Sequence, residues 1–76
     1  MTGEQCRMAR AALHWTMEEL AGKCDLAKRT IVAIEGNRSM RGSTVWRIQN
    51  VFEAHGIQFV DNGVQRRQYY ITGEQA

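Results

Sequence analysis

The feature that most constrains this chain is one polar residue, Asp25, between two short segments of helical pattern. Apolar residues recur at helical spacing over residues 17–24, and again over residues 27–35. Two short helices can turn sharply only if a residue between them is left-handed. Asp tolerates that conformation better than most residues other than glycine. The pattern therefore predicts two short helices joined by a tight turn.

The first of these helices has a clear start signal. Thr16 is an N-cap residue, and Glu19 follows three positions later, which makes a capping box. Trp15, just before the cap, can pack on Leu20. The helix is expected over residues 17–24. Its apolar side carries Met17, Leu20, Ala21 and Cys24.

The second helix is expected over residues 27–35, with Leu26 reaching back into the core. Ile31 and Ile34 mark its buried side, helped by Ala27 and Thr30. Gly36-Asn37 ends it in the usual manner of a helix C-terminus. The opposite side of this helix carries Lys28, Arg29, Val32 and Ala33.

Two more helical segments flank this pair. An earlier one is expected over residues 5–13, where Cys6, Ala9 and Leu13 form an apolar stripe that Met8 and Ala12 widen, while Arg7 and Arg10 lean away. A later one is expected over residues 44–55, capped by Ser43 or Thr44 and ended by Gly56. Its buried stripe consists of Val45, Ile48, Val51 and Phe52.

The chain changes character after Gly56. Residues 57–60 favour a strand, residues 61–63 form a strong turn signal, and residues 64–71 favour a second strand. A chain of 76 residues forms a single small globular body. We expect a mostly α fold, with four helices in a helix-turn-helix unit over residues 1–56. Residues 57–76 would add a short β-hairpin or strand.

The segment from Thr16 to Glu35 resembles the helix-turn-helix of Cro/repressor-type (XRE-like) regulators of bacteria and phages. The residues that fit its pattern are Leu20-Ala21, Cys24, Leu26, Thr30-Ile31 and Ile34-Glu35. The resemblance extends over about residues 5–56, and it suggests that Arg10 and Glu35 pair across two helices. Met17, Asp25 and Ala27 stand where the family usually has Gln, Gly and Ser.

The resemblance implies sequence-specific binding of double-stranded DNA as a transcriptional regulator, with a repressor expected. Residues 27–35 would enter the major groove, where the fork of Arg29 matches the two acceptors of guanine. Five cations and one anion lie between Lys28 and Arg47, as expected for a segment that holds a polyanion. The candidate base contacts are Lys28, Arg29, Val32 and Ala33. The candidate backbone contacts are Thr16, Met17, Arg38, Arg41, Ser43, Thr44 and Arg47.

One reading helix covers few base pairs, so we expect a homodimer on an inverted repeat. Trp46 lies off the core stripe, and the strand over residues 64–71 would leave an open edge. The expected interface is therefore Trp46, Tyr69, Tyr70 and Ile71. Alternatively, Trp46 packs under the hairpin. A second function is also open, an antitoxin-type module that binds a partner protein and regulates its own synthesis.

Other classes of protein are disfavoured. Cys6, Cys24, His14 and His55 lack the spacing of a metal site or disulfide framework, so we expect no metal and no cofactor. No nucleophile–base constellation or phosphate-binding glycine loop is present, so we expect no enzyme. No run approaches the about 18–20 apolar residues that cross a bilayer, and no signal peptide is evident. We expect a cytoplasmic protein.

Overall fold

A computed structural model describes residues 1–38 and 41–66 of the chain. Over these residues the fold is four helices followed by a two-stranded antiparallel hairpin, which confirms the expected fold class. The elements are α1 (Gly3–Ala12), α2 (Met17–Cys24), α3 (Lys28–Glu35), α4 (Gly42–Ala54), β1 (Ile57–Val60) and β2 (Gly63–Arg66).

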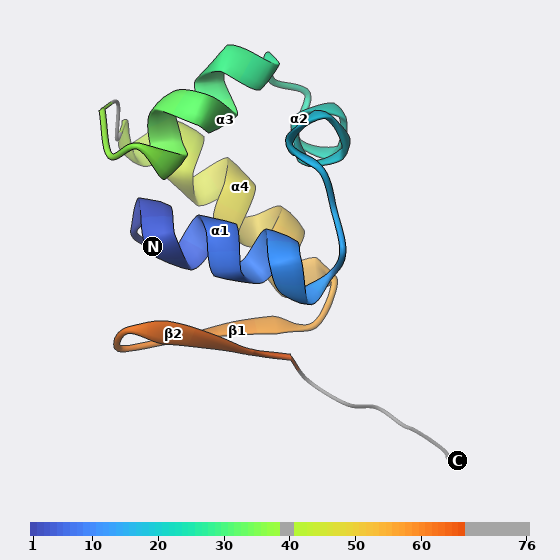
Figure 1. Ribbon diagram of the computed structural model, residues 1–76, viewed down its shortest axis with the longest axis vertical. Coiled ribbons are helices and arrows are strands. Elements are labelled where there is room, and N and C mark those ends of the chain that lie inside the picture. Colours follow the sequence, from blue (N-terminus) through green and yellow to red (C-terminus); the bar gives the residue numbers. More distant parts are fainter. Residues whose placement is uncertain (39–40, 67–76) are drawn as a thin grey trace.

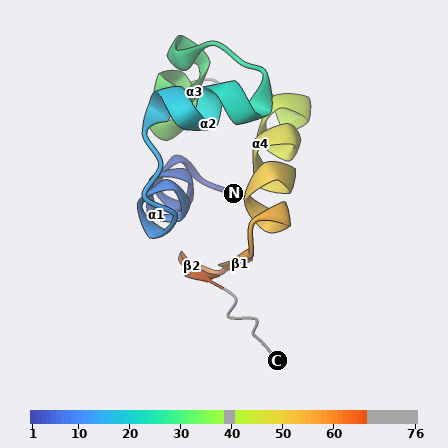
Figure 2. The ribbon, with the colours of Figure 1, turned by 90° about the vertical axis from the view of Figure 1, so that its right-hand side faces the viewer.

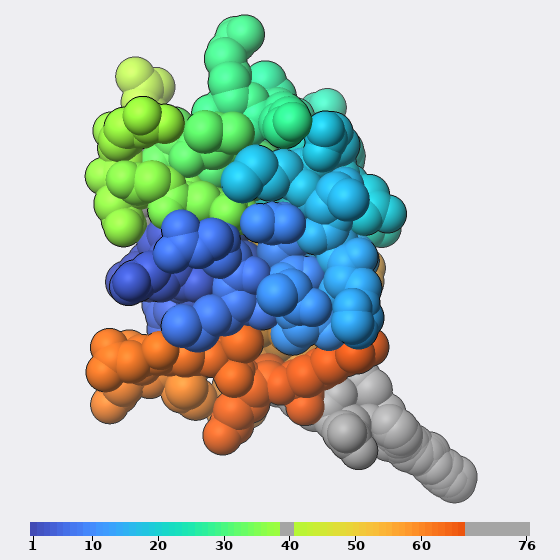
Figure 3. Space-filling model, in the orientation of Figure 1, coloured from blue at the N-terminus to red at the C-terminus, as the bar shows by residue number. Residues whose placement is uncertain are grey.

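The elements form three tiers (Figures 1 and 2). α2 and α3 pack on each other at one end, α1 and α4 lie in the middle, and the hairpin closes the other end. α1 packs on α3 and β2, whereas α4 packs on α2 and β1. The space-filling view shows α1 held between the α2–α3 pair above and the hairpin below (Figure 3). The exposed side of α3 is therefore remote from the hairpin.

The turn between α2 and α3 has the predicted geometry. Asp25 adopts the left-handed conformation, with φ 57° and ψ 47°, and ends α2. The Leu26 N–H donates to the Ala21 carbonyl at 2.9 Å, which closes the turn. At the other end of α2, the Thr16 N–H donates to Glu19 Oε1 and the Glu19 N–H donates to Thr16 Oγ1. The predicted capping box and helix bounds are confirmed.

The core draws on all four helices and on β1. The Trp15 ring stacks on Phe52, with centroids 5.8 Å apart, and Phe59 of β1 meets Phe52 edge-on. Such aromatic contacts bury large apolar areas and fix how the helices and the hairpin meet. The fully buried apolar residues are Cys6, Ala9, Leu20, Ala21, Cys24, Ile31, Ile34, Ile48, Phe52 and Ile57.

A forked ion pair joins α1 to α3 inside this core. Arg10 Nε lies 2.8 Å from Glu35 Oε2, and Arg10 Nη2 lies 3.1 Å from Glu35 Oε1. A third donor, Arg10 Nη1, reaches the Trp15 carbonyl at 3.1 Å. The Cys6 thiol donates to Glu35 Oε2, and burial together with that carboxylate raises the pKa of Cys6 to about 12. The pairing of Arg10 with Glu35 that the family resemblance suggested is present.

The start of α1 lies against the end of α3. A Cβ at Gly3 would be 2.5 Å from the Ile34 carbonyl oxygen and 2.6 Å from that of Glu35, so no larger residue fits. The Gly3 N–H donates to Asn37 Oδ1 at 3.0 Å, and Asn37 itself is left-handed, with φ 56°. The close contact of Gly3 with these carbonyls determines how near α1 packs to α3.

A buried glutamine ties α1 to the hairpin. The Gln5 amide nitrogen donates to the carbonyls of Val60 and Gly63, which pair across the hairpin turn. Its amide oxygen accepts from the Thr2 N–H at 2.9 Å, as part of a second capping box. Gln5 is only 6% exposed, so these bonds satisfy polar groups that would otherwise be costly to bury. The hairpin is therefore bonded to the helical unit.

Several sequence-based expectations require correction. α4 begins at Gly42 and its N-cap is Arg41, so the prediction of a Ser43 or Thr44 cap is wrong. The low helix propensity of glycine favours a loop at Gly42, but packing of α4 on α2 and β1 outweighs it. Met8, predicted to widen the apolar stripe of α1, is 43% exposed.

The remaining differences concern element bounds. α1 spans Gly3–Ala12 instead of residues 5–13, because the capping box at Thr2 starts the helix earlier. Ala27 is the N-cap of α3 and lies outside the helix. β2 ends at Arg66 among the described residues. The rest of the strand expected over residues 64–71 lies outside them.

We expect Glu35→Gln to lower the free energy of unfolding by about 3 kcal/mol, the lower end for breaking a buried pair, because Arg10 would keep its charge in a part-buried position without a counterion. Urea denaturation followed by tryptophan fluorescence measures the loss. Glu53→Gln is the matched control, since Glu53 is exposed and its side chain bonds only to Gln49 among the described residues. Equal stability of the two variants would contradict a structural role for the ion pair.

Candidate nucleic-acid interface

The open side of α3 carries the residues predicted to contact bases. Lys28, Arg29 and Val32 are exposed, and Ala33 is half-buried, whereas Ile31 and Ile34 on the other side are fully buried. This division follows from the helical repeat, because burying Ile31 and Ile34 on one side turns Arg29, Val32 and Ala33 toward the other. α3 therefore presents two cations and small apolar side chains on one uncovered surface.

Lys28 is not isolated on this surface. Its Nζ lies 3.0 Å from Glu18 Oε2 of α2, and both side chains are more than half exposed, at 54% and 65%. The hydrogen bond and the charge of Lys28 hold the pKa of Glu18 below its usual value. A pair this exposed contributes little to stability. Lys28 can therefore exchange Glu18 for another anion at small cost.

The helix N-termini fall into two groups. α1 and α2 begin with complete capping boxes, whereas the N-caps of α3 and α4, Ala27 and Arg41, make no side-chain capping bond. Backbone N–H groups in the first turn of an uncapped helix remain available to bind an anion. In α4 these groups belong to Gly42, Ser43 and Thr44.

The N-terminus of α2 is less open than the sequence suggested. The capping box occupies the N–H groups of Thr16 and Glu19, and the carboxylates of Glu18 and Glu19 stand at this helix end. A phosphate contact at Thr16 and Met17 would depend on the remaining backbone donors, so it stays a prediction. The start of α4 faces no such competition, because its first turn carries no acidic residue and its N-cap, Arg41, is an exposed cation.

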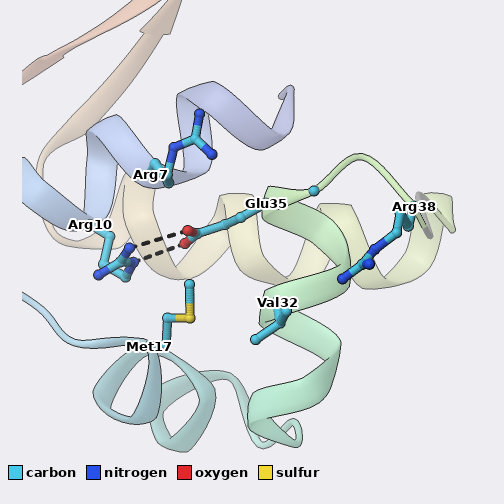
Figure 4. A pocket seen from close by; sticks show the side chains of 7 residues that line it. Arg7, Arg10, Met17, Val32, Glu35 and Arg38 are labelled. Atoms are coloured by element: carbon cyan, nitrogen blue, oxygen red, sulfur yellow. Dashed lines mark hydrogen bonds and ion pairs between the residues drawn. The ribbon is translucent and has the colours of Figure 1, made fainter.

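A groove lies beside α3, between that helix, α1 and the start of α2 (Figure 4). Arg38 extends along α3 toward Val32, and Arg7 stands on the α1 side of the Glu35 carboxylate. A Cβ on Gly36 would lie 3.3 Å from Arg38 Nε, so the glycine leaves room for the Arg38 side chain. The lining residues are Arg7, Arg10, Met17, Val32, Glu35, Gly36 and Arg38.

The groove is lined by three of the predicted DNA contacts and by one cation that was not predicted. The three come from separate parts of the predicted interface, and they are Met17, Val32 and Arg38. Arg7 was not among the predicted contact residues, although its position away from the apolar stripe of α1 indicated an exposed cation. The suggested Arg10–Glu35 pair already places α1 beside α3, but the sequence does not show that Arg7 borders the same groove as Arg38.

The residues predicted for a dimer interface are only partly described. Trp46 is 68% exposed on α4, so the alternative that it packs under the hairpin is wrong for residues 57–66, the part of the hairpin that the structure describes. Tyr69, Tyr70 and Ile71 lie outside the described residues.

Other kinds of site have no support in the described part of the chain. No group of three or more His, Cys, Asp or Glu residues in residues 1–38 and 41–66 could hold a metal ion. Cys6 and Cys24 are both buried free thiols. No helix within those ranges has the length and apolar character needed to cross a membrane.

No protein-family model matches the sequence, and no curated protein shows significant similarity to it. The described residues form a helix-turn-helix pair supported by two further helices and a hairpin.

We expect Lys28→Met to raise the pKa of Glu18 toward its ordinary value, since the variant loses both the hydrogen bond and the charge that lower it. An NMR titration of the Glu18 side-chain carboxyl measures the shift. Lys23→Met is the control. It removes a cation from the same helix as Glu18, but the Lys23 ammonium lies over the Trp15 ring and is not paired with Glu18. An unchanged pKa of Glu18 in the Lys28 variant would show that the pair is not formed in solution.

Proposed function

We propose that this protein binds double-stranded DNA sequence-specifically as a transcriptional regulator, most simply a repressor, with α3 in the major groove. The observation that carries the proposal is the α2–α3 pair. Its left-handed turn at Asp25 packs the two helices together, while Lys28, Arg29 and Val32 remain uncovered on α3. The major groove of B-DNA admits an α-helix presented in this way.

The side chains on this surface suit both kinds of contact that such proteins make. The guanidinium of Arg29 can donate two parallel hydrogen bonds to guanine, and Val32 and Ala33 can contact thymine methyl groups. Lys28 can bind a base or a phosphate. Contacts to the DNA backbone, which position the protein, are proposed for Arg38, Arg41, Ser43, Thr44 and Arg47, and for the start of α2 at Thr16 and Met17.

The electrostatics of residues 28–47 support an anionic partner. Glu35 is the only acidic residue in this segment, against five cations. Glu35 is 4% exposed and its carboxylate is bound by Arg10, so its charge is neutralised inside the protein. The cations Lys28, Arg29, Arg38, Arg41 and Arg47 are all exposed. The solvent-exposed charges of residues 28–47 are therefore positive.

We expect Arg29→Ala to remove the base preference at one position of the site that the wild-type protein selects from a random DNA pool. Binding to the preferred site should weaken by roughly 1–3 kcal/mol. Arg41→Ala, which removes an exposed cation next to the start of α4, should weaken binding to all sequences about equally. If Arg29→Ala left the selected sequence unchanged, Arg29 would not read a base.

A homodimer that binds an inverted repeat is part of this proposal. The exposed ring of Trp46 on α4 is the largest apolar side chain left uncovered among the described residues, and monomers seldom leave such groups open. The same ring also fits the alternative function, an antitoxin-type module that binds a partner protein. A cytoplasmic location is proposed as well, since Cys6 and Cys24 are free thiols.

We expect Trp46→Ser to shift the protein from dimer to monomer, because the substitution removes the apolar ring without disturbing the core. Sedimentation equilibrium of both proteins, free and bound to the selected site, measures the change. Met8→Ser is the matched control, an exposed apolar side chain on α1. A wild-type protein that stays monomeric on DNA would contradict the dimer, and capture of a different partner chain by Trp46 would favour the alternative.

A further inference from the structure

The groove beside α3 is lined by more cations than form ion pairs within the described residues. Arg7, Arg10 and Arg38 line it together with one acid, Glu35, which leaves a net charge of +2 from three cations and one anion. Arg10 is committed to Glu35 and to the Trp15 carbonyl. Neither Arg7 nor Arg38 has a side-chain hydrogen bond or ion pair to any described residue, and both are exposed.

The groove is also continuous with the surface that we propose for base contacts. Val32 is on its rim and is 36% exposed on the open side of α3, and the Arg38 side chain runs along the same helix toward it (Figure 4). A strand of DNA whose bases meet Val32 would carry its sugar–phosphate backbone past this rim. The groove is thus placed beside a backbone segment of the bound duplex.

We propose that this groove receives a phosphate of the DNA backbone, bound by the guanidiniums of Arg7 and Arg38. The inference rests on the proposed function, because it needs α3 to lie in the major groove. Arg7 thereby becomes a DNA contact on α1, a helix otherwise outside the interface. The Met17 side chain that forms the wall toward α2 has no hydrogen-bond donor, so the side-chain donors of the groove belong to its arginines, of which Arg7 and Arg38 make no side-chain bond within the described residues.

The ion pair at the base of the groove favours this assignment. Both oxygens of the Glu35 carboxylate are bonded to Arg10, and the side chain is 3% exposed, so little of its negative charge opposes an incoming anion. Arg10 in turn keeps two of its five N–H donors beyond those bound to Glu35 and Trp15. Arginine matches phosphate geometry with paired donors, which makes such contacts both strong and directional.

Arg7→Gln tests the proposal, because the substitution removes one charge from an exposed side chain that makes no bond to the described fold. Affinity should be measured over a range of salt concentrations, with the site selected by the wild-type protein and with an unrelated duplex of equal length. We expect a roughly tenfold loss on both duplexes, as for one charge-assisted hydrogen bond. The slope of log affinity against log salt should fall by about 0.9, one phosphate contact.

Two matched variants separate a contact from a general effect of charge. Arg66→Gln makes the same change on β2, at the hairpin end of the molecule, where Arg66 bonds to the Ala12 carbonyl. It should alter affinity and salt slope much less. Arg7→Lys keeps the positive charge and should retain most of both. Thermal unfolding of each variant verifies that the fold is intact.

Replacing single DNA phosphates with methylphosphonates locates the contact. At the phosphate in the groove, the replacement should lower the DNA affinity of the wild-type protein and cause no further loss of affinity in Arg7→Gln. If Arg7→Gln and Arg66→Gln behave alike while the wild-type protein binds its selected site, the groove assignment is wrong and the proposed function stands.

Two further outcomes would also overturn the assignment. If the wild-type protein binds no duplex, both the groove assignment and the proposed function fail. If inorganic phosphate raises the melting temperature of the wild-type protein but not of Arg7→Gln, and DNA affinity is unchanged, the groove holds a free anion instead.

Discussion

The forked ion pair between Arg10 and Glu35 is the contact on which the arrangement of the helices depends. Glu35 is the last residue of α3, and its carboxylate is nearly inaccessible to water, so the charge requires a partner from another element. Arg10 supplies it from α1 and also bonds the Trp15 carbonyl just before α2. One guanidinium therefore joins α1, the link between α1 and α2, and the end of α3. It also removes the only acidic charge from a segment that otherwise presents cations.

α1 connects the two ends of the molecule. At its start, Gly3 approaches the last carbonyls of α3 more closely than any side chain would allow, and Asn37 bonds its N–H. Two residues later, Gln5 donates to both carbonyls at the base of the hairpin turn. α1 is thus fixed at once to the end of α3 and to the hairpin. The position of α3, and with it of the cationic surface, is defined relative to the opposite end of the fold.

The parts of this structure that local chemistry determines could be predicted from the sequence. Thr16 and Glu19 mark the start of α2 with a capping box, and Asp25 marks its end, so both bounds follow from neighbours along the chain. The Gln5 bonds could not be predicted, since a polar residue in a first helical turn does not indicate a partner more than fifty positions away. The groove could not be predicted either, because the suggested Arg10–Glu35 pair brings α1 to α3 but does not show that Arg7 and Arg38 line one depression.

The outward and inward sides of α3 differ in role, and this difference affects how the sequence of such a protein can change in evolution. Arg29 and Val32 face outward, and Arg29 makes no side-chain bond to the described fold, whereas Ile31, Ile34 and Glu35 on the same helix hold the core together. Under the proposed function, substitutions at the outer positions change which DNA sequence the surface binds without loss of folding stability. A gene duplicate could therefore acquire a new target by a few single-codon changes, while selection keeps the inner positions constant.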